Sequence, residues 1–267
     1  MLENPLLAAW RAGRATANAW LGLGDGLSAE VIARRGYDSV TFDLQHGAAS
    51  LADLPRLLQA VSGSAAVPLV RVPSNDAAQI MRALDLGALG VVVPMVESAA
   101  EAAAAVAAAL YPPAGRRSYG PLRAGLVHGA DQHERANDQL ALFAMVETAP
   151  GLEQLDAIAA TPGLTGLYVG PADLSYAVGA APRIDSTDPR QMAAVERILQ
   201  ACRAHGKVAG IHTGSVEFAR RAVERGFRFV TITIDYVTLG QAAGSRLAEF
   251  RAPVPGAAEN VPRGPVS

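Results

Sequence analysis

Residues 68–94, PLVRVPSNDAAQIMRALDLGALGVVVP, contain two short apolar runs, 68–72 and 90–94, separated by a helical pattern that ends at Gly87. Each run has too few polar residues to form a solvated face. Such runs are typical of parallel strands that are buried on both sides. A helix between two of these strands predicts a strand–helix–strand unit of a parallel sheet.

The same pattern recurs along the chain. The apolar runs cover residues 20–23, 39–44, 68–72, 90–94, 140–146, 164–169, 208–212 and 229–234. Eight strand–helix units in about 250 residues favour a (β/α)8 TIM barrel, an α/β fold in a single domain, over an open doubly wound sheet with a lid. We expect the barrel over residues 1–252 and a Pro/Gly-rich tail over 253–267.

Composition narrows the class of function. Half of the 267 residues are hydrophobic, 18% are charged, and the formal net charge is −2. This balance predicts a soluble globular protein and gives no electrostatic footprint for nucleic acid or an anionic membrane. A single cysteine, Cys202, and the absence of a signal-like start at residues 1–4 favour the cytoplasm. The glycines within residues 22–26 do not have the G-x-G-x-x-G spacing of a phosphate-binding loop, so we do not expect a bound nucleotide.

Polar residues stand at the carboxyl ends of the predicted strands, where barrel enzymes place their active sites. Glu147 and Asp173 follow adjacent strands and would suit a hard divalent cation such as Mg²⁺ or Mn²⁺. A helix cap at Glu147 and a turn at Asp173 are the alternative interpretations.

Two further strand ends carry candidate groups, and Trp20 could form a wall of the pocket. His46 could transfer protons near neutral pH, or it could be a structural histidine. Arg71 interrupts an apolar run and needs an anionic partner, either a substrate carboxylate or Asp43. A base, an arginine and a metal together suit proton abstraction next to a carbonyl, with the enolate held by the metal.

A Schiff-base mechanism needs a lysine in the pocket. Lys207 is the only lysine, and it begins a predicted strand, which is the wrong end of a barrel for catalysis. The sequence therefore predicts no Schiff-base lysine.

Six blocks carry a family resemblance: residues 42–47 (FDLQHG), 68–71 (PLVR), 93–96 (VPMV), 111–116 (YPPAGR), 146–148 (VET) and 169–175 (VGPADLS). In this order they resemble the HpcH/HpaI aldolase family of metal-dependent pyruvate aldolases. The resemblance implies a barrel of the phosphoenolpyruvate/pyruvate type. It also implies a class II aldehyde-lyase that joins a 2-oxo acid donor, pyruvate or hydroxypyruvate for example, to an aldehyde acceptor.

The same resemblance implies roles for particular residues. Glu147 and Asp173 would hold Mg²⁺, Mn²⁺ or Co²⁺, and Arg71 would stabilise the keto oxygen of the donor. His46 would be the base, and Asp85 the acid that raises its basicity. Backbone at Gly170, Pro171 and Ala172, beside Asp173, would contact the donor carboxylate. Family members assemble as hexamers, dimers of trimers, with sites near subunit contacts.

Three residues depart from the family pattern. Gln45 stands where many members have glutamate, Met145 where a glutamine is usual, and His212 where an apolar residue is common. Met145 cannot donate a hydrogen bond to the donor, so the donor preference could differ, and His212 could contact the acceptor or a larger donor. Trp20, Met145 and His212 are therefore candidate substrate-binding residues. Residues 117–121 are closer to branches that include macrophomate synthase, which keeps open decarboxylation of an oxaloacetate-type acid. A non-catalytic barrel that binds 2-oxo acids is the second alternative.

One connection is too long for the usual short loops between elements. Residues 111–139 separate a predicted helix from the next predicted strand, and connections of this length are uncommon unless they are functional. We expect this segment to form a subunit contact.

Overall fold

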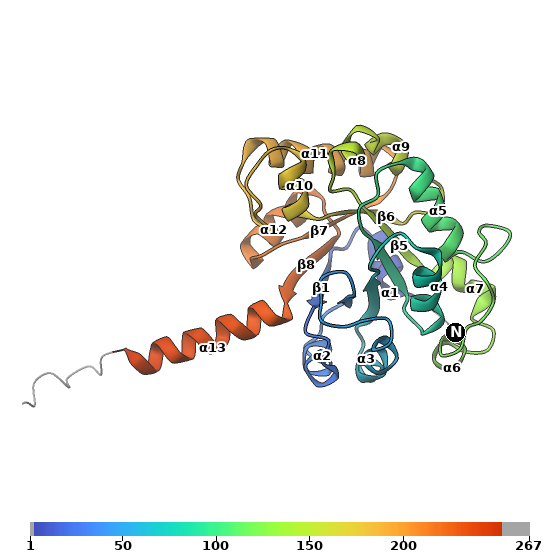
Figure 1. Ribbon diagram of the computed structural model, residues 1–267, viewed down its shortest axis with the longest axis horizontal. Coiled ribbons are helices and arrows are strands. Elements are labelled where there is room, and N and C mark those ends of the chain that lie inside the picture. The colour runs from blue at the N-terminus through green and yellow to red at the C-terminus, as the bar shows by residue number, and fades with distance from the viewer. Residues whose placement is uncertain (1–2, 253–267) are drawn as a thin grey trace, which may run out of the picture.

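The computed structural model describes residues 3–252, in which eight parallel strands close into a barrel in the order β1 to β8 (Figure 1). The strands are β1 (Thr16–Leu21), β2 (Ser39–Asp43), β3 (Val67–Arg71), β4 (Gly90–Val93), β5 (Ala141–Met145), β6 (Gly166–Val169), β7 (Val208–His212) and β8 (Phe229–Ile234). The predicted (β/α)8 barrel is confirmed. The tail expected over 253–267 lies outside the described residues.

Helices surround these strands (Figure 1). They are α1 (Pro5–Arg11), α2 (Gly26–Ala33), α3 (Leu54–Val61), α4 (Ala77–Asp85), α5 (Ala99–Ala109), α6 (Ala124–His128), α7 (His133–Gln139), α8 (Ala149–Glu153), α9 (Leu155–Ala159), α10 (Pro171–Ala177), α11 (Pro189–Ala204), α12 (Val216–Arg225) and α13 (Asp235–Arg251). None of those within residues 3–252 has the length and apolar character needed to cross a membrane.

Helix ends follow the local sequence in most places. Ser98 accepts a hydrogen bond from the Glu101 backbone N–H and caps α5, as the capping-box spacing predicts. Gly87 has a φ of 102°, the left-handed conformation expected just after a helix. Before α3, the Asp53 carboxylate accepts hydrogen bonds from the backbone N–H and the hydroxyl of Ser50, and the helix begins at the next residue, Leu54.

Strand β1 begins earlier than the apolar run at 20–23 indicates. Its first half carries Thr16 and Asn18, both fully buried. Asn18 donates a hydrogen bond to Thr231 Oγ1 at 2.9 Å and accepts hydrogen bonds from Ser39 and Thr41 at 2.8 and 3.0 Å. Because these polar side chains satisfy one another inside the barrel, they can occupy a strand that hydrophobicity alone does not reveal.

Helix α1 closes the amino-terminal end of the barrel. The Trp10 ring lies edge-on to Phe143, with centroids 5.4 Å apart, and 5.6 Å from Phe229. Its indole N–H donates to Thr16 Oγ1 at 2.9 Å. The floor of the barrel is therefore packed by aromatic side chains.

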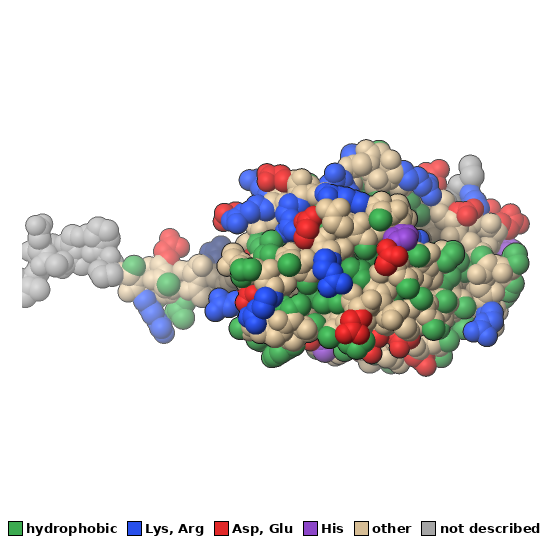
Figure 2. All heavy atoms as spheres, turned by 90° about the horizontal axis from the view of Figure 1, so that it is seen from above, with side chains coloured by type: hydrophobic (Ala, Val, Ile, Leu, Met, Phe, Trp, Pro, Cys, Tyr) green, Lys and Arg blue, Asp and Glu red, His purple; other side chains and the backbone are tan. Residues whose placement is uncertain are grey.

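Beyond its first turn, helix α13 does not pack against its own barrel. It projects away from β8 (Figure 1), and hydrophobic, basic and acidic side chains lie side by side on its described part (Figure 2). Asp235, its first residue, is the only one buried. Leu239 is 61% exposed and Phe250 is 86% exposed. The face of β8 that the eighth helix of a regular barrel would cover is left open.

Candidate functional site

A cavity of about 190 Å³ opens at the carboxyl ends of the strands. Its lining comprises Trp20, Asp43, His46, Arg71, Met145, Glu147, Gly170, Pro171, Ala172, Asp173, Ile184, His212, Ile234 and Tyr236. Every site residue expected from the sequence lies here except Asp85. The barrel topology explains this convergence, because parallel strands deliver their last residues to one end.

Asp43, Arg71 and Trp20 form a fixed unit in the wall of the cavity. Arg71 donates to Asp43 through Nε at 2.9 Å and through Nη2 at 2.5 Å, and Trp20 Nε1 donates to the same carboxylate at 3.1 Å. The guanidinium carbon lies 5.0 Å from the centre of the Trp20 ring. Burial favours the protonated Asp43, but hydrogen bonding and charge from Arg71 outweigh it and hold the pKa of Asp43 below its usual value.

The salt-bridge interpretation of Arg71 is therefore correct, yet it does not use the whole guanidinium. Nε and Nη2 are engaged by Asp43, whereas Nη1 makes no hydrogen bond to residues 3–252. Arginine carries five N–H donors in a planar fork. Arg71 can thus keep its buried partner and still present a donor to a substrate oxygen.

Glu147 follows β5 and has one oxygen that the protein leaves without a partner. Its Oε1 accepts a hydrogen bond from the Met95 backbone N–H at 3.0 Å, whereas the buried Oε2 has no partner among the described residues. Met95 has a φ of 56°, an uncommon conformation for a residue with a side chain. A Cβ added at Gly170 would lie 1.9 Å from Glu147 Oε2, so this approach requires glycine there.

Asp173 lies in the first turn of α10 and faces the same cavity. Burial raises the pKa of Glu147 to about 7, and the negative charge of Asp173 adds to this shift. Two carboxylates, one with an unpartnered oxygen, fit a divalent cation that also takes oxygen ligands from water or substrate. Within residues 3–252, no group of three or more His, Cys, Asp or Glu side chains could hold a metal, so a pair is the largest such set.

The raised pKa predicts how stability depends on pH in the metal-free protein. The pKa of Glu147 moves from 4.5 to about 7 on folding. Between these values the folded state holds a proton that the unfolded state has lost, so the free energy of unfolding falls as pH rises through this window. At about 1.4 kcal/mol per pKa unit, the loss reaches roughly 3 kcal/mol by pH 8. Urea unfolding in EDTA at pH 5 to 8 measures it.

The matched variant is Glu147→Gln, which cannot titrate and should lack this part of the pH slope. Subtracting its profile removes the contribution of every other titrating group, because the two proteins share all of them. Parallel profiles for the two proteins would contradict the assigned protonation of Glu147.

His46 lies exposed at the rim of the cavity, after β2. Its backbone N–H donates to Asp43 Oδ1 at 3.2 Å, as does the N–H of Gln45 at 3.0 Å. A Cβ at Gly47 would lie 2.2 Å from the Asp43 carbonyl oxygen, so the tight turn requires glycine. Asp43 thus orients both Arg71 and the turn that presents His46.

Asp85 is not part of this cavity. It is the last residue of α4, which runs back from the carboxyl end of β3 toward the amino-terminal end of the barrel. There its carboxylate accepts a hydrogen bond from Arg117 Nη2 at 2.7 Å, and the Arg117 guanidinium lies 4.4 Å from the Tyr111 ring centre. Within one chain, Asp85 and His46 therefore stand at opposite ends of the barrel.

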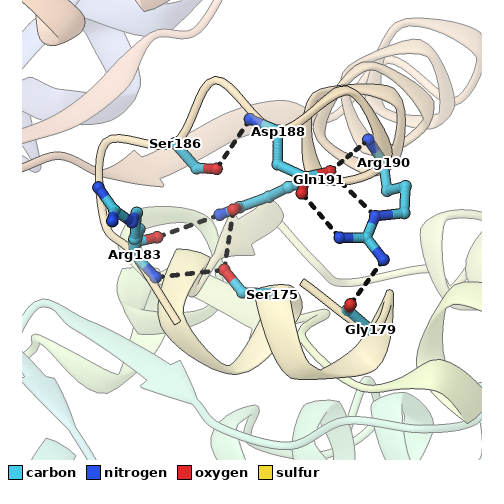
Figure 3. A network of polar contacts seen from close by, with 7 residues as sticks. All are labelled: Ser175, Gly179, Arg183, Ser186, Asp188, Arg190 and Gln191. Atoms are coloured by element: carbon cyan, nitrogen blue, oxygen red, sulfur yellow. Dashed lines mark hydrogen bonds and ion pairs between the residues drawn. The ribbon is translucent and has the colours of Figure 1, made fainter. Parts of the chain in front are cut away.

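The sequence gives no signal for Ile184, which comes from the loop between α10 and α11. Gln191, at the start of α11, holds this loop, because its amide donates to the Arg183 carbonyl at 3.2 Å and its carbonyl accepts from Ser175 at 2.8 Å (Figure 3). Asp185 accepts a hydrogen bond from the Gly214 N–H at 2.7 Å. These contacts carry Ile184 into the cavity.

The lysine and the cysteine both lie away from the cavity. Lys207 donates to the carbonyl oxygens of Thr161 and Leu164 at 3.0 and 2.9 Å, just before β7 begins. Cys202 is buried, and burial raises the pKa of its thiol to about 12. Neither side chain is placed to act as a nucleophile in the cavity.

Comparison with known proteins extends over the whole barrel. The family model for HpcH/HpaI aldolase/citrate lyase matches residues 17–242. A hydroxypyruvate/pyruvate aldolase of Rhizorhabdus wittichii is 36% identical, covering 93% of this chain and 99% of that protein. A 4-hydroxy-2-oxo-heptane-1,7-dioate aldolase of Escherichia coli is 36% identical, covering 94% and 96%.

Solved structures agree with these sequence matches. An HpcH/HpaI aldolase/citrate lyase family protein from Burkholderia cenocepacia has a TM-score of 0.87 and 33% identity, covering 93% of this chain and 100% of that chain. The matched range 17–242 contains every residue that lines the cavity.

Proposed function

Because the chain belongs to the HpcH/HpaI aldolase/citrate lyase family, we propose that it is a divalent-metal-dependent (class II) aldehyde-lyase that makes and cleaves 4-hydroxy-2-oxo acids. The donor is pyruvate or a related 2-oxo acid such as hydroxypyruvate, and the acceptor is an aldehyde. The two relatives named as aldolases, each 36% identical over most of the chain, support this reaction.

One observation carries the proposal: a single cavity brings together His46, Arg71 and the carboxylate pair Glu147 and Asp173. A protein that only bound a carboxylate would need the arginine but neither an imidazole nor paired acids. Proton abstraction next to a carbonyl needs all three kinds of group.

Each group has a separate task. A divalent cation held by Glu147 and Asp173 would withdraw electrons from the donor's keto oxygen. Arg71, fixed by Asp43, offers its free Nη1 to the charge that develops on that oxygen. His46 takes the proton from the donor carbon next to the keto group. The backbone from Gly170 to Ala172 faces the donor carboxylate.

Exchange of the pyruvate methyl protons in D₂O tests the proposal. We expect exchange with added Mg²⁺ or Mn²⁺, loss of exchange with EDTA, and recovery when excess metal is restored. Borohydride should trap no covalent adduct with pyruvate, because Lys207 lies outside the cavity. Absence of metal-dependent exchange for both pyruvate and hydroxypyruvate would contradict the proposal. A covalent adduct at Lys207 would indicate a Schiff-base mechanism in place of the metal-dependent one.

The alternatives are less well supported. Release of CO₂ from oxaloacetate would reveal decarboxylation, but the relatives named above are aldolases rather than decarboxylases. The single buried thiol at Cys202 supports action in a reducing compartment, the cytoplasm.

We also propose a homohexamer, a dimer of trimers. Two separate surfaces with exposed apolar side chains support it: α13, where Leu239 and Phe250 are exposed, and the segment 119–127, where Leu126 is 84% exposed. A groove of about 430 Å³ beside α12 is lined by outward-facing Val230 and Ile232 of β8, and it suits the α13 helix of a second copy. A hexamer of this symmetry needs two kinds of contact.

The role of Asp85 belongs to the same proposal. Asp85 lies beside Arg117 and Gly120, at the edge of the segment 119–127. Contact between that segment and the cavity rim of a neighbouring subunit would place Asp85 near the neighbour's His46. The two residues of a single chain are too far apart for this contact.

Leu239→Asp combined with Phe250→Asp tests the contact through α13. We expect light scattering after gel filtration to show a smaller assembly than the wild type, because the charges would have to enter an apolar groove. Gln241→Asp adds a charge at a polar position of the same helix and should leave the assembly unchanged. An unaltered mass for the double variant would exclude α13 from the interface.

A further inference from the structure

His212 is the polar residue of the cavity to which the proposed reaction assigns no task. It is the last residue of β7, partly buried, and it lines the cavity together with Trp20 and Met145. Its ring lies edge-on to the Trp20 indole, with centroids 5.0 Å apart and an interplanar angle of 83°. This contact holds the imidazole in the cavity wall.

Trp20 also fixes His212 relative to the reacting end of the cavity. The Arg71 guanidinium carbon lies 5.0 Å from the same indole ring that His212 touches edge-on. His212 and Arg71 therefore contact the same side chain, and both line the cavity in which a substrate that meets Arg71 would lie.

The imidazole has unused hydrogen-bonding capacity. Among residues 3–252, its ring nitrogens have no hydrogen-bonding partner. Burial, reinforced by the positive charge of Arg71, lowers the pKa of His212 to about 4, so the ring is uncharged at neutral pH. An uncharged imidazole has one N–H donor and one nitrogen acceptor. It suits a group that both donates and accepts, and a hydroxyl is such a group.

The other residues of the cavity wall also favour a hydroxyl as the partner of His212. The side chains of Met145, Ile184 and Ile234, which line the same cavity, offer no hydrogen bond to a polar group beside them. A substrate hydroxyl buried there without a partner would lose its hydrogen bonds to water, and this loss disfavours binding. His212 is placed to remove that penalty.

We propose that His212 selects hydroxylated substrates, by hydrogen bonding to a hydroxyl on the carbon next to the reacting carbonyl group. The hydroxyl can belong to the donor, as in hydroxypyruvate, or to the acceptor, as in glycolaldehyde. The inference rests on the proposed aldolase function and adds to it the chemical class that the cavity prefers.

The test compares wild type, His212→Leu and His212→Gln with matched substrates. Pyruvate and hydroxypyruvate are compared as donors with propionaldehyde, and propionaldehyde and glycolaldehyde as acceptors with pyruvate. We expect His212→Leu to lose about ten-fold in kcat/KM for the hydroxylated member of one pair, mainly through KM, as for a lost hydrogen bond. Pyruvate with propionaldehyde should be nearly unaffected. His212→Gln, whose amide also donates and accepts, should restore much of the preference.

The outcomes separate the two proposals. A selective loss with hydroxypyruvate assigns the hydroxyl to the donor, and a selective loss with glycolaldehyde assigns it to the acceptor. If His212→Leu turns over every pair in the same ratio as wild type, or loses all pairs equally, His212 has no role in selection. If wild type itself turns over no pair, the aldolase function fails, and the inference about His212 fails with it.

Discussion

The His46→Ala variant should exchange the methyl protons of pyruvate with D₂O about 10²–10⁴ times more slowly than wild type, the usual contribution of a general base. Its affinity for Mn²⁺ should be unchanged. His46 lies exposed at the rim after β2, whereas the carboxylates come from the end of β5 and from α10. The hydrogen bond to Asp43 uses the His46 backbone, so alanine keeps the turn. NMR exchange and calorimetry provide the two measurements.

His205→Ala is the control for a general effect of losing an imidazole. His205 pairs with the exposed Asp156 at 2.8 Å, away from the cavity, and its removal should leave exchange within about two-fold, since exposed ion pairs contribute little. Exchange by His46→Ala at more than half the wild-type rate would assign the base to another group.

Glu147→Gln should move metal affinity and stability in opposite directions. Removing a residue that hydrogen-bonds to a metal ligand weakens metal binding by roughly 10–100-fold. Removing the charge of a direct ligand should therefore weaken Mn²⁺ binding by more than about 100-fold. The metal-free variant should nevertheless be more stable than wild type at pH 8, because burial of the ionised Glu147 is unfavourable. The hydrogen bond from the Met95 N–H to Oε1 can persist with glutamine. Calorimetry with Mn²⁺ and urea unfolding in EDTA measure the two effects.

Glu153→Gln is the matched control, since Glu153 ends α8 at an exposed position outside the cavity. It should change neither the affinity for Mn²⁺ nor the free energy of unfolding. If Glu147→Gln bound Mn²⁺ as tightly as wild type, Glu147 would not be a metal ligand, and the carboxylate pair would need another explanation.

The barrel could be predicted because most of its strands are covered on both sides, so that they appear in the sequence as short apolar runs. The prediction failed at the start of β1, where Thr16 and Asn18 are buried. Their hydrogen-bonding partners, such as Thr231, lie far away in the sequence. Local hydrophobicity cannot show that a polar side chain is satisfied by a strand more than two hundred residues later.

The cavity residues that stand at the carboxyl ends of strands could be predicted, because parallel strands bring those ends together. Ile184 and Tyr236 could not be found in this way, because a loop and the first turn of α13 carry them. The loop depends on side-chain contacts such as those of Gln191 with Arg183 (Figure 3). Asp85 came only from the family resemblance, and a single chain does not bring it to His46.

The two tryptophans of the chain stand at opposite ends of the barrel, Trp10 in the packed floor and Trp20 against Arg71 and His212. The wall of the cavity therefore contains a fluorescent residue, Trp20. With Trp10 replaced by phenylalanine, all indole fluorescence would come from the side chain that touches the charged wall of the site. Binding of a metal or a 2-oxo acid could then be followed by its emission alone, without turnover and without any attached label.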